Sequence, residues 1–233
     1  MSLITAKGNE AVESATKAKV DLTKVMIRLK DGESVKVRLL SSEDFVEYQA
    51  ISSFGLGVYT QPSREPLGEK DYFVEASKLA DAKAGGVDET FKELFPRKRY
   101  LIAMADVETG ALRAWDASKA QFNSFVAALE EYKEIIDDKE EIVFNFKRTG
   151  NKTDTTYSLS PVMRPKAVDL EGFHKFDDVV ADIPFFESLL IPRTPELQVT
   201  VLKENGFPVE QYFPEIKLED ATATEEVSPL DQI

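Results

Sequence analysis

The sequence predicts an α+β fold built on a small, curved antiparallel sheet, with helices inserted into the sheet and following it. Three observations lead to this prediction. Short runs of alternating apolar residues recur between residues 24 and 162, and turn-forming residues separate them. One longer stretch between two such runs has the spacing of an amphipathic helix. The chain after Pro165 becomes acidic and helical in pattern.

Composition narrows the classes of protein that this chain can represent. Its 233 residues are 42% hydrophobic, which is enough to build a core. The absence of cysteine and the presence of one histidine exclude disulfides, thiolate zinc sites, cysteine nucleophiles and histidine-cluster metal sites. No run of about 18 apolar residues predicts a membrane span, and the first residues lack a signal peptide's apolar block. We therefore expect a cytoplasmic protein with no cofactor or metal, which binds a partner or uses carboxylates for catalysis.

The first half of the chain is expected to hold three strands and a helical insertion. Residues 1–22 are polar and are interpreted as an N-terminal arm. Residues 25–29 and 35–39 alternate around Asp31-Gly32, which predicts a hairpin, and a further strand is expected over 45–52. The strand rhythm then stops, and residues 66–95 are expected to form an insertion with a helix over 73–83.

The clearest unit follows this insertion. Strands are expected over 99–106 and 111–115, with a tight turn at Glu108-Thr109-Gly110. A helix over 119–133 is expected to begin at Ser118, which can form a capping box with Gln121. Two more strands are expected over 141–148 and 153–159. In the strand after Pro96, alternation places Lys98, Tyr100, Ile102 and Met104 on one face and Arg99, Leu101, Ala103 and Ala105 on the other.

The C-terminal third is expected to contain helices and then an acidic tail. Apolar residues at helical spacing over 176–183 predict one helix. Thr194-Pro195-Glu196 predicts the start of another, and Gly206 predicts its end. Residues 215–233 are acidic and lack aromatic residues, which is typical of a disordered tail. The net charge of −13 is therefore uneven, with −3 over residues 1–170 and −10 over residues 171–233.

This order of elements fits a five-stranded Greek-key barrel of the OB type. The expected organisation is an arm over 1–22, an OB core over 23–165 with the insertion near 66–95, a helical segment over 166–214, and the acidic tail over 215–233.

Cations and aromatic residues recur in the same expected hairpins, and this combination suits single-stranded nucleic acid. The phosphate backbone of a single-stranded nucleic acid binds in a cationic groove, and its unstacked bases bind on flat aromatic surfaces. Duplex DNA would favour a basic recognition helix, which the sequence does not contain. Trp115 has two interpretations, because it can stack on a base or seal the helix against the sheet. Phe144 and Phe146 are interpreted as core residues.

Several motifs, taken in order, resemble bacteriophage single-stranded DNA-binding proteins of the helix-destabilising type. They are the first strand at 33–40, the basic-aromatic run at 96–104, the hairpin and helix start at 110–119, and the late hairpin at 144–150 with Tyr157-Ser158. The resemblance covers residues 24–162 loosely. It departs from relatives with a Cys/His zinc subdomain, because residues 60–95 contain neither residue type. It also departs from relatives with a basic N-terminal segment for cooperative self-association, because this arm has few cations.

The resemblance implies an OB core that binds single-stranded DNA regardless of sequence, in phage replication, recombination or repair. It implies an acidic tail that recruits replication or recombination proteins and competes with DNA, and we expect a monomer or weak self-association. By position, Tyr100 and Trp115 match base-stacking aromatics, and the residues matching backbone-contacting cations are Arg97, Lys98, Arg99, Arg113, Lys147, Arg148 and Lys152. The further expected DNA-binding residues are Lys36, Arg38, Tyr48, Phe54, Tyr59 and Tyr157. The expected partner-binding residues of the tail are Glu225, Glu226, Leu230, Asp231 and Ile233.

Two other functions are consistent with the sequence. A protein-interaction module would use the sheet or the C-terminal helices, and its cations would serve solubility. A Mg²⁺-dependent nuclease would use carboxylates, and the candidates are Asp106, Glu108 and Asp116, or Asp177, Asp178 and Asp182. These carboxylates are also ordinary turn or solvated-face residues, so we expect a binding protein rather than an enzyme.

Overall fold

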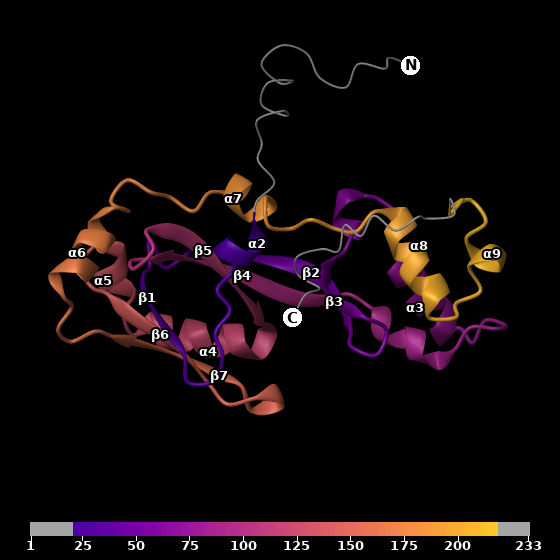
Figure 1. Cartoon of the computed structure of the whole chain (residues 1–233), viewed down its shortest axis with the longest axis horizontal. Helices are drawn as coiled ribbons and strands as arrows, with labels where there is room; N and C mark the ends of the chain where they lie inside the picture. The colour runs from indigo at the N-terminus through magenta and orange to yellow at the C-terminus, as the bar shows by residue number, and fades with distance from the viewer. Residues whose placement is uncertain (1–20, 219–233) are drawn as a thin grey trace, which may run out of the picture.

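The computed structural model describes residues 21–218 and shows an α+β protein with one antiparallel sheet and surrounding helices (Figure 1). The N-terminal arm before residue 21 and the tail from residue 219 onward lie outside the described residues. The strands are β1 (Ser34–Arg38), β2 (Phe45–Ser53), β3 (Val58–Pro62), β4 (Arg97–Asp106), β5 (Ala111–Ser118), β6 (Phe144–Thr149) and β7 (Thr156–Pro161). The α-helices are α2 (Leu22–Val25), α3 (Tyr72–Asp81), α4 (Lys119–Glu130), α5 (Lys133–Asp137), α6 (Ala167–His174), α7 (Ile183–Glu187), α8 (Pro195–Glu204) and α9 (Val209–Tyr212). The 3₁₀ helices are η1 (Glu65–Leu67), η2 (Glu89–Leu94) and η3 (Lys152–Asp154).

The central strand of the sheet is β4. One edge of β4 pairs with β2 and then with β1, and its other edge pairs along its length with β5. The remaining strands extend the sheet through β1–β6 and β6–β7 on one side and through β2–β3 on the other. The sheet therefore has seven strands rather than the five of the expected barrel type, because β2 and β3 extend it beyond the curled part.

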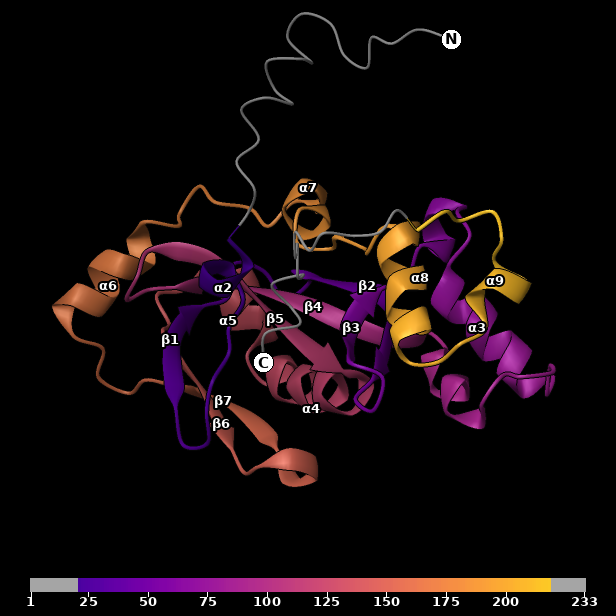
Figure 2. The ribbon, with the colours of Figure 1, turned by 45° about the vertical axis from the view of Figure 1, so that its right-hand side comes forward.

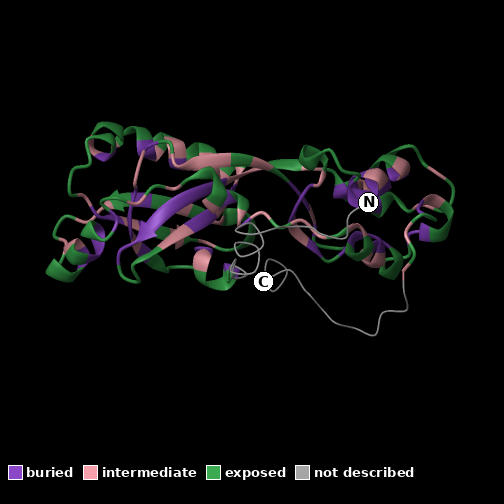
Figure 3. Cartoon of the chain, turned by 90° about the horizontal axis from the view of Figure 1, so that it is seen from above, coloured by how far each residue is buried: buried purple, intermediate pink, exposed green. Residues whose placement is uncertain are grey.

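Five strands in the spatial row β5–β4–β1–β6–β7 curl around one apolar core. Apolar residues of all five strands meet in this core, and α4 covers it with Phe125 and Leu129. The end strands β5 and β7 approach each other through Trp115 and Tyr157, whose ring centroids are 4.6 Å apart. Viewed from above, buried residues follow these strands through the body of the molecule (Figure 3). The sheet thus forms a half-barrel closed by α4.

The helical insertion forms a second core with the end of the chain. α3 and η2 pack against β2 and β3, and α8 and α9 cover them. Phe73, Phe91 and Leu202 are fully buried in this core. In Figures 1 and 2 the half-barrel and this helical part lie at opposite ends of an elongated molecule, and β2 and β4 run between them.

The segment between β7 and α8 runs along the length of the molecule (Figure 1). α6 packs on the end of β1, where Lys36 pairs with Asp169 at 2.8 Å. Gly172 lies so close to the turn after β4 that an added Cβ would be 2.0 Å from the Val107 carbonyl oxygen. Further along, Phe186 and Leu189 of the α7 region pack on the face of β4 and β5 that points away from α4. The segment therefore covers one face of the sheet.

Local signals predicted several elements correctly. Ser118 caps α4 and forms the expected capping box with Gln121. Thr194 caps α8, and Gly206 follows it with a φ of 83°. The two expected faces of β4 are also confirmed, because Ile102 and Met104 enter the α4-covered core while Leu101 and Ala103 enter the α7-covered one.

Two expected elements are wrong. Residues 25–29 do not form a hairpin with β1. The turn at Asp31-Gly32 exists, but Met26 bridges Ala114 of β5 in parallel, and the Ile27 N–H donates to the Ala114 carbonyl. Residues 176–183 are not a continuous helix. Phe176 is buried in the connection after α6, whereas Val180 and Ile183 are exposed. These apolar residues therefore lie in or next to the connection between two short helices and do not form one helical face.

The connection between β1 and β2 contains a carboxyl group with a raised pKa. Burial raises the pKa of Asp44 to about 6, and the nearby Asp137 charge adds to this effect. Its Oδ2 atom is buried without a hydrogen-bond partner. The Asp44 carboxyl thus binds its proton more tightly in the folded protein than in the unfolded chain. Its contribution to the free energy of unfolding therefore decreases as pH rises from about 4 to about 6, and it is destabilising above that range.

We expect Asp44→Asn to stabilise the protein at neutral and higher pH. Because the side chain is only partly buried, the gain in unfolding free energy should be about 1 kcal/mol at about pH 8 and should vanish below about pH 4. Urea unfolding at several pH values measures it. Glu43→Gln is the matched control, because it removes the charge of an exposed neighbouring carboxyl group and should change the unfolding free energy little at any pH. A stability gain for Asp44→Asn at every pH would contradict this account.

Candidate nucleic-acid interface

The basic run that opens β4 lines a groove on the sheet. The groove has a volume of about 550 Å³, and its charged residues are Arg97, Lys98 and Arg99 from β4 and Lys119 from the start of α4. Ala50, Ser52, Ser118 and Ala120 complete its lining. We call it the basic groove. It lies where the half-barrel joins the helical part of the molecule.

The four cations of the basic groove differ in how far they are neutralised. Arg99 forms an ion pair with Asp116 at 2.8 Å, and Lys98 forms one with Glu47 at 2.9 Å. Arg97 and Lys119 are exposed and form no ion pair within residues 21–218. The guanidinium of Arg97 lies 4.5 Å from the centre of the exposed Phe95 ring. Two exposed cations of the groove are thus outside any ion pair of the described residues, although Lys119 lies near enough to Glu47 to help lower the pKa of that carboxyl.

Asp116 is the centre of a hydrogen-bond network that holds Arg99 of the basic groove. Its carboxylate accepts from Arg99 Nε and Nη2 and from the Tyr48 hydroxyl. Burial raises the pKa of Tyr48 well above its ordinary value, and the Asp116 charge raises it further. Tyr48 therefore stays a hydrogen-bond donor, and Tyr48 and Arg99 have structural roles in addition to their expected role in binding.

A second hollow, of about 190 Å³, adjoins the basic groove. Its lining includes Thr60, Trp115, Asp116, Arg148 and Tyr157, together with the segment from Met26 to Leu29 that contains Arg28. We call it the aromatic pocket. Two contacts join it to the basic groove: Asp116 pairs with Arg99, and the Thr60 N–H donates to Ser52 Oγ at 3.0 Å.

Trp115 seals α4 against the sheet, which is the second of its two expected roles. Its side chain is only 2% exposed, and its ring meets Phe125 of α4 and Phe146 of β6 edge-on. Tyr157 is half-buried and stacks on Phe146, with an interplanar angle of 13°. Tyr157 is therefore the aromatic ring with accessible surface at this pocket.

The turn between β2 and β3 presents the most exposed aromatic side chain. Phe54 is 83% exposed and meets the half-buried Tyr59 edge-on at 5.5 Å. An exposed aromatic ring offers a flat surface on which a base of any sequence can stack. Phe54 and Tyr59 thus remain candidates for base stacking.

Other expected site residues are held elsewhere. Arg38 is only 4% exposed and is bound by Asp177 and the Phe173 carbonyl. Lys36 pairs with Asp169 of α6. Both β1 cations that were expected to contact DNA are therefore engaged by α6 or by the residue Asp177 that follows it. Arg113 pairs with Asp106 at 3.0 Å. Tyr100 stacks on Phe122 of α4, with ring centroids 3.9 Å apart.

Lys147 and Lys152 are exposed on the β6–β7 hairpin, and neither lines the basic groove or the aromatic pocket. The expected partner-binding residues of the tail, Glu225, Glu226, Leu230, Asp231 and Ile233, lie outside the described residues.

Sequence reasoning missed Arg28, Thr60 and Lys119 as lining residues. A signal existed for Lys119, because a lysine at the first position of a helix opposes the helix dipole and suggests another role. Arg28 and Thr60 come from segments far from β5 in sequence, and no local pattern brings them to it.

The carboxylates considered for a nuclease lie in separate interactions. Asp106 binds Arg113 and the backbone of its turn, Asp116 binds Arg99, Asp177 binds Arg38 and His174, and Asp182 caps α7. Within residues 21–218, no three histidine or acidic side chains converge as a metal-binding group.

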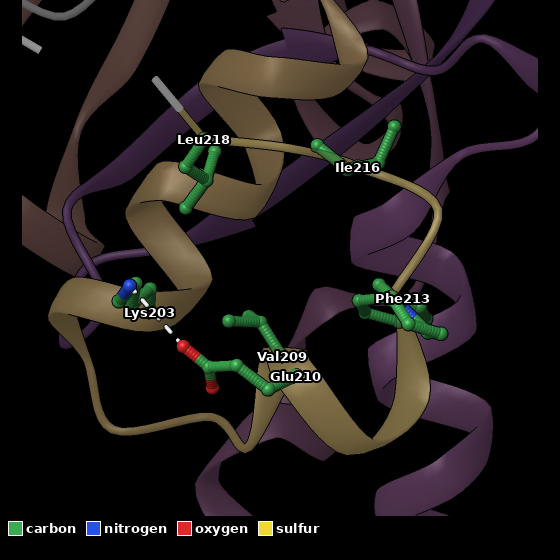
Figure 4. Close-up of a pocket in the computed structure, with 7 residues that line it drawn as sticks. Lys203, Val209, Glu210, Phe213, Ile216 and Leu218 are labelled. Atoms are coloured by element: carbon green, nitrogen blue, oxygen red, sulfur yellow. Dashed lines mark ion pairs between the residues drawn. The ribbon is translucent and has the colours of Figure 1, made fainter. Parts of the chain in front are cut away.

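Two other hollows contain few cations. A cavity of about 310 Å³ beside α8 and α9 is lined by Val209, Phe213, Ile216 and Leu218, and the Lys203–Glu210 ion pair crosses its rim (Figure 4). A groove of about 640 Å³ between β2, η1 and the α7 region is mostly apolar, with Leu67, Leu190 and Pro192 in its lining.

No protein-family model matches the chain, and no curated protein is significantly similar to it. Among the described residues, no helix combines the length and the apolar character that crossing a membrane requires.

We expect Asp116→Ala to destabilise the fold, because it leaves the partly buried Arg99 guanidinium and the Tyr48 hydroxyl without their acceptor. The expected loss of unfolding free energy is about 2 kcal/mol. Glu47→Ala is the control, because it removes the exposed partner of Lys98 and should cost less than about 1 kcal/mol. Denaturant unfolding compares the two variants, and equal losses would show that the Asp116 network has no special weight.

Proposed function

We propose that this protein binds single-stranded nucleic acid without sequence preference, using the basic groove and the adjoining aromatic pocket. The observation that carries the proposal is the juxtaposition of two exposed cations, Arg97 and Lys119, with aromatic side chains at the edge of one curled sheet. Neither cation forms an ion pair with another of the described residues. Cations neutralise the phosphate backbone, and aromatic faces accept bases of any sequence.

The strand order supports this proposal. The row β5–β4–β1–β6–β7, with α4 inserted between β5 and β6, is compatible with an OB-like fold. Ligands of OB folds lie across the second and third strands, between the loop joining strands one and two and the loop joining strands four and five. Here those strands are β4 and β5, which contribute residues to both hollows, and the first loop includes Thr60.

The acidity of the chain is compatible with this function when charge is considered by region. Taken over the whole chain, a net charge of −13 repels nucleic acid. The charge is concentrated after residue 170, whereas the basic groove lies in the sheet. On the resemblance to phage helix-destabilising proteins, we propose that the acidic tail competes with DNA for the groove and recruits replication or recombination proteins.

A protein-interaction module is the second candidate function. The apolar groove beside α7 favours it, because Leu67 at its edge is 63% exposed and the neighbouring Ile191 is 51% exposed. This function predicts no salt-dependent binding of DNA.

Fluorescence anisotropy with labelled oligo-dT of about 30 nucleotides tests the proposal, with a duplex of equal length as the control. We expect sub-micromolar binding to the single strand that weakens steeply with salt, and much weaker binding to the duplex. Absence of binding at low salt, both with the tail and after deletion of residues 219–233, would leave the interaction module as the better account.

We expect Arg97→Gln and Lys119→Gln each to weaken oligo-dT binding and to reduce the salt slope by about 0.7, because each removes one phosphate contact. Phe54→Ala should weaken binding about tenfold while leaving the salt slope unchanged, because stacking releases no counterion. Lys133→Gln on α5 is the matched control, since it makes the same charge change outside the groove. A Lys133→Gln effect equal to that of Lys119→Gln would indicate binding through net charge alone.

A further inference from the structure

The aromatic pocket has the features of a site for one nucleotide. We propose that it holds a single nucleotide unit, with the base on Tyr157 and the phosphate between Arg28 and Arg148. This inference deepens the proposed function and rests on it, because it assigns one position along the bound strand to a discrete pocket.

The base-binding wall is rigid. Tyr157 is supported from behind by Phe146, with ring centroids 5.4 Å apart, and at its side by Trp115 at 4.6 Å. Phe146 and Trp115 belong to the core, so Tyr157 cannot retreat when a base contacts it. A fixed aromatic surface loses little conformational entropy on binding, which favours stacking of a planar heterocycle.

The cationic side of the pocket has an unused donor. Arg148 donates from Nη1 to the Leu29 carbonyl at 2.6 Å and from Nη2 to Thr155 Oγ1 at 3.4 Å. Its Nε–H is buried and has no hydrogen-bond partner among residues 21–218. A buried donor without an acceptor is costly, and a phosphate oxygen is an acceptor that a guanidinium binds strongly.

Arg28 supplies a second guanidinium to the same pocket. Burial lowers its pKa from the ordinary value, and the nearby Asp116 charge offsets this only in part. Thr60 lies at the rim with a φ of 48°, which a β-branched residue rarely adopts, and its hydroxyl can donate to or accept from a base edge.

The size of the pocket and its acidic wall limit it to one unit. A volume of about 190 Å³ gives room for one heterocycle, whereas the adjoining basic groove is larger, at about 550 Å³. Asp116 stands between them and repels a phosphate placed directly over it. The strand would therefore place one phosphate at Arg28 and Arg148, and the next cationic contacts would come from the basic groove.

Trp115 provides a direct test, because it is the only tryptophan of the chain and lines the pocket. Its fluorescence is followed in the full chain during titration with dTMP, thymidine and inorganic phosphate. We expect a saturable change with dTMP at millimolar concentration, and at least about tenfold weaker responses to thymidine and to phosphate alone, because each lacks half of the contacts. No saturable change with dTMP, or an equal response to phosphate, would overturn the proposal.

Paired variants separate a binding effect from a folding effect. Tyr157→Ala should weaken dTMP binding about tenfold, whereas Tyr157→Phe keeps the stacking face and should bind as the parent does. Arg28→Gln should weaken dTMP binding, whereas Lys119→Gln should leave it unchanged while weakening oligo-dT. Thermal unfolding identifies any variant that has lost its fold. If Tyr157→Ala and Arg28→Gln remain folded and keep parental dTMP affinity, the nucleotide site is elsewhere and this proposal fails.

Oligo-dT binding distinguishes failure of this inference from failure of the proposed function. Binding of oligo-dT without binding of dTMP would overturn the one-nucleotide pocket and leave strand binding through the basic groove. Absence of both would overturn strand binding and the pocket together. Binding of dTMP without oligo-dT would support the pocket and overturn strand binding as the function.

Discussion

The pairing of β4 on both of its edges is the constraint on which the rest of the structure depends. β2 and β1 share one edge of β4, and β5 occupies the other. Because side chains alternate along a strand, the same ten residues also supply two cores, with Ile102 and Met104 facing α4 and Leu101 and Ala103 facing α7. A one-residue shift in register would exchange these faces and place the charged residues of the N-terminal half in the wrong environment.

The position of the basic groove follows from where β4 begins. Arg97 and Lys98 lie before the strand enters the α4-covered core, so apolar side chains are not needed at these positions. The same strand is therefore polar at its start and fully buried from Leu101 to Asp106. The start of α4 lies against this end of the sheet and adds Lys119. The change of environment along one strand thus explains why cations gather at this place.

Opposite charges within the candidate interface have distinct physical roles. Asp116 fixes Arg99 and Tyr48 in one arrangement, because a partly buried guanidinium and hydroxyl need an acceptor. Arg97 and Lys119 remain at the surface without an ion pair in the described part of the chain, and only such cations can exchange counterions for phosphates at low cost. The C-terminal segment holds two cations of β1, because Lys36 pairs with Asp169 of α6 and Arg38 pairs with Asp177 just after α6.

The sequence by itself determined the elements whose signals are local. Caps at Ser118 and Thr194, the turn glycines and the alternation of β4 depend on residues a few positions apart, and all are present. Only the tertiary structure decided which elements pair. The alternating residues 25–29 fit either a hairpin or a parallel contact with β5, because alternation sets the period of a strand and not its partner. Arg38 and Asp177 form their ion pair although they are 139 residues apart in sequence. Arg28 and Thr60 come to the aromatic pocket beside β5 from two separate segments. The burial of Arg38 and the lining of the pocket therefore follow from long-range packing, which no local sequence pattern predicts.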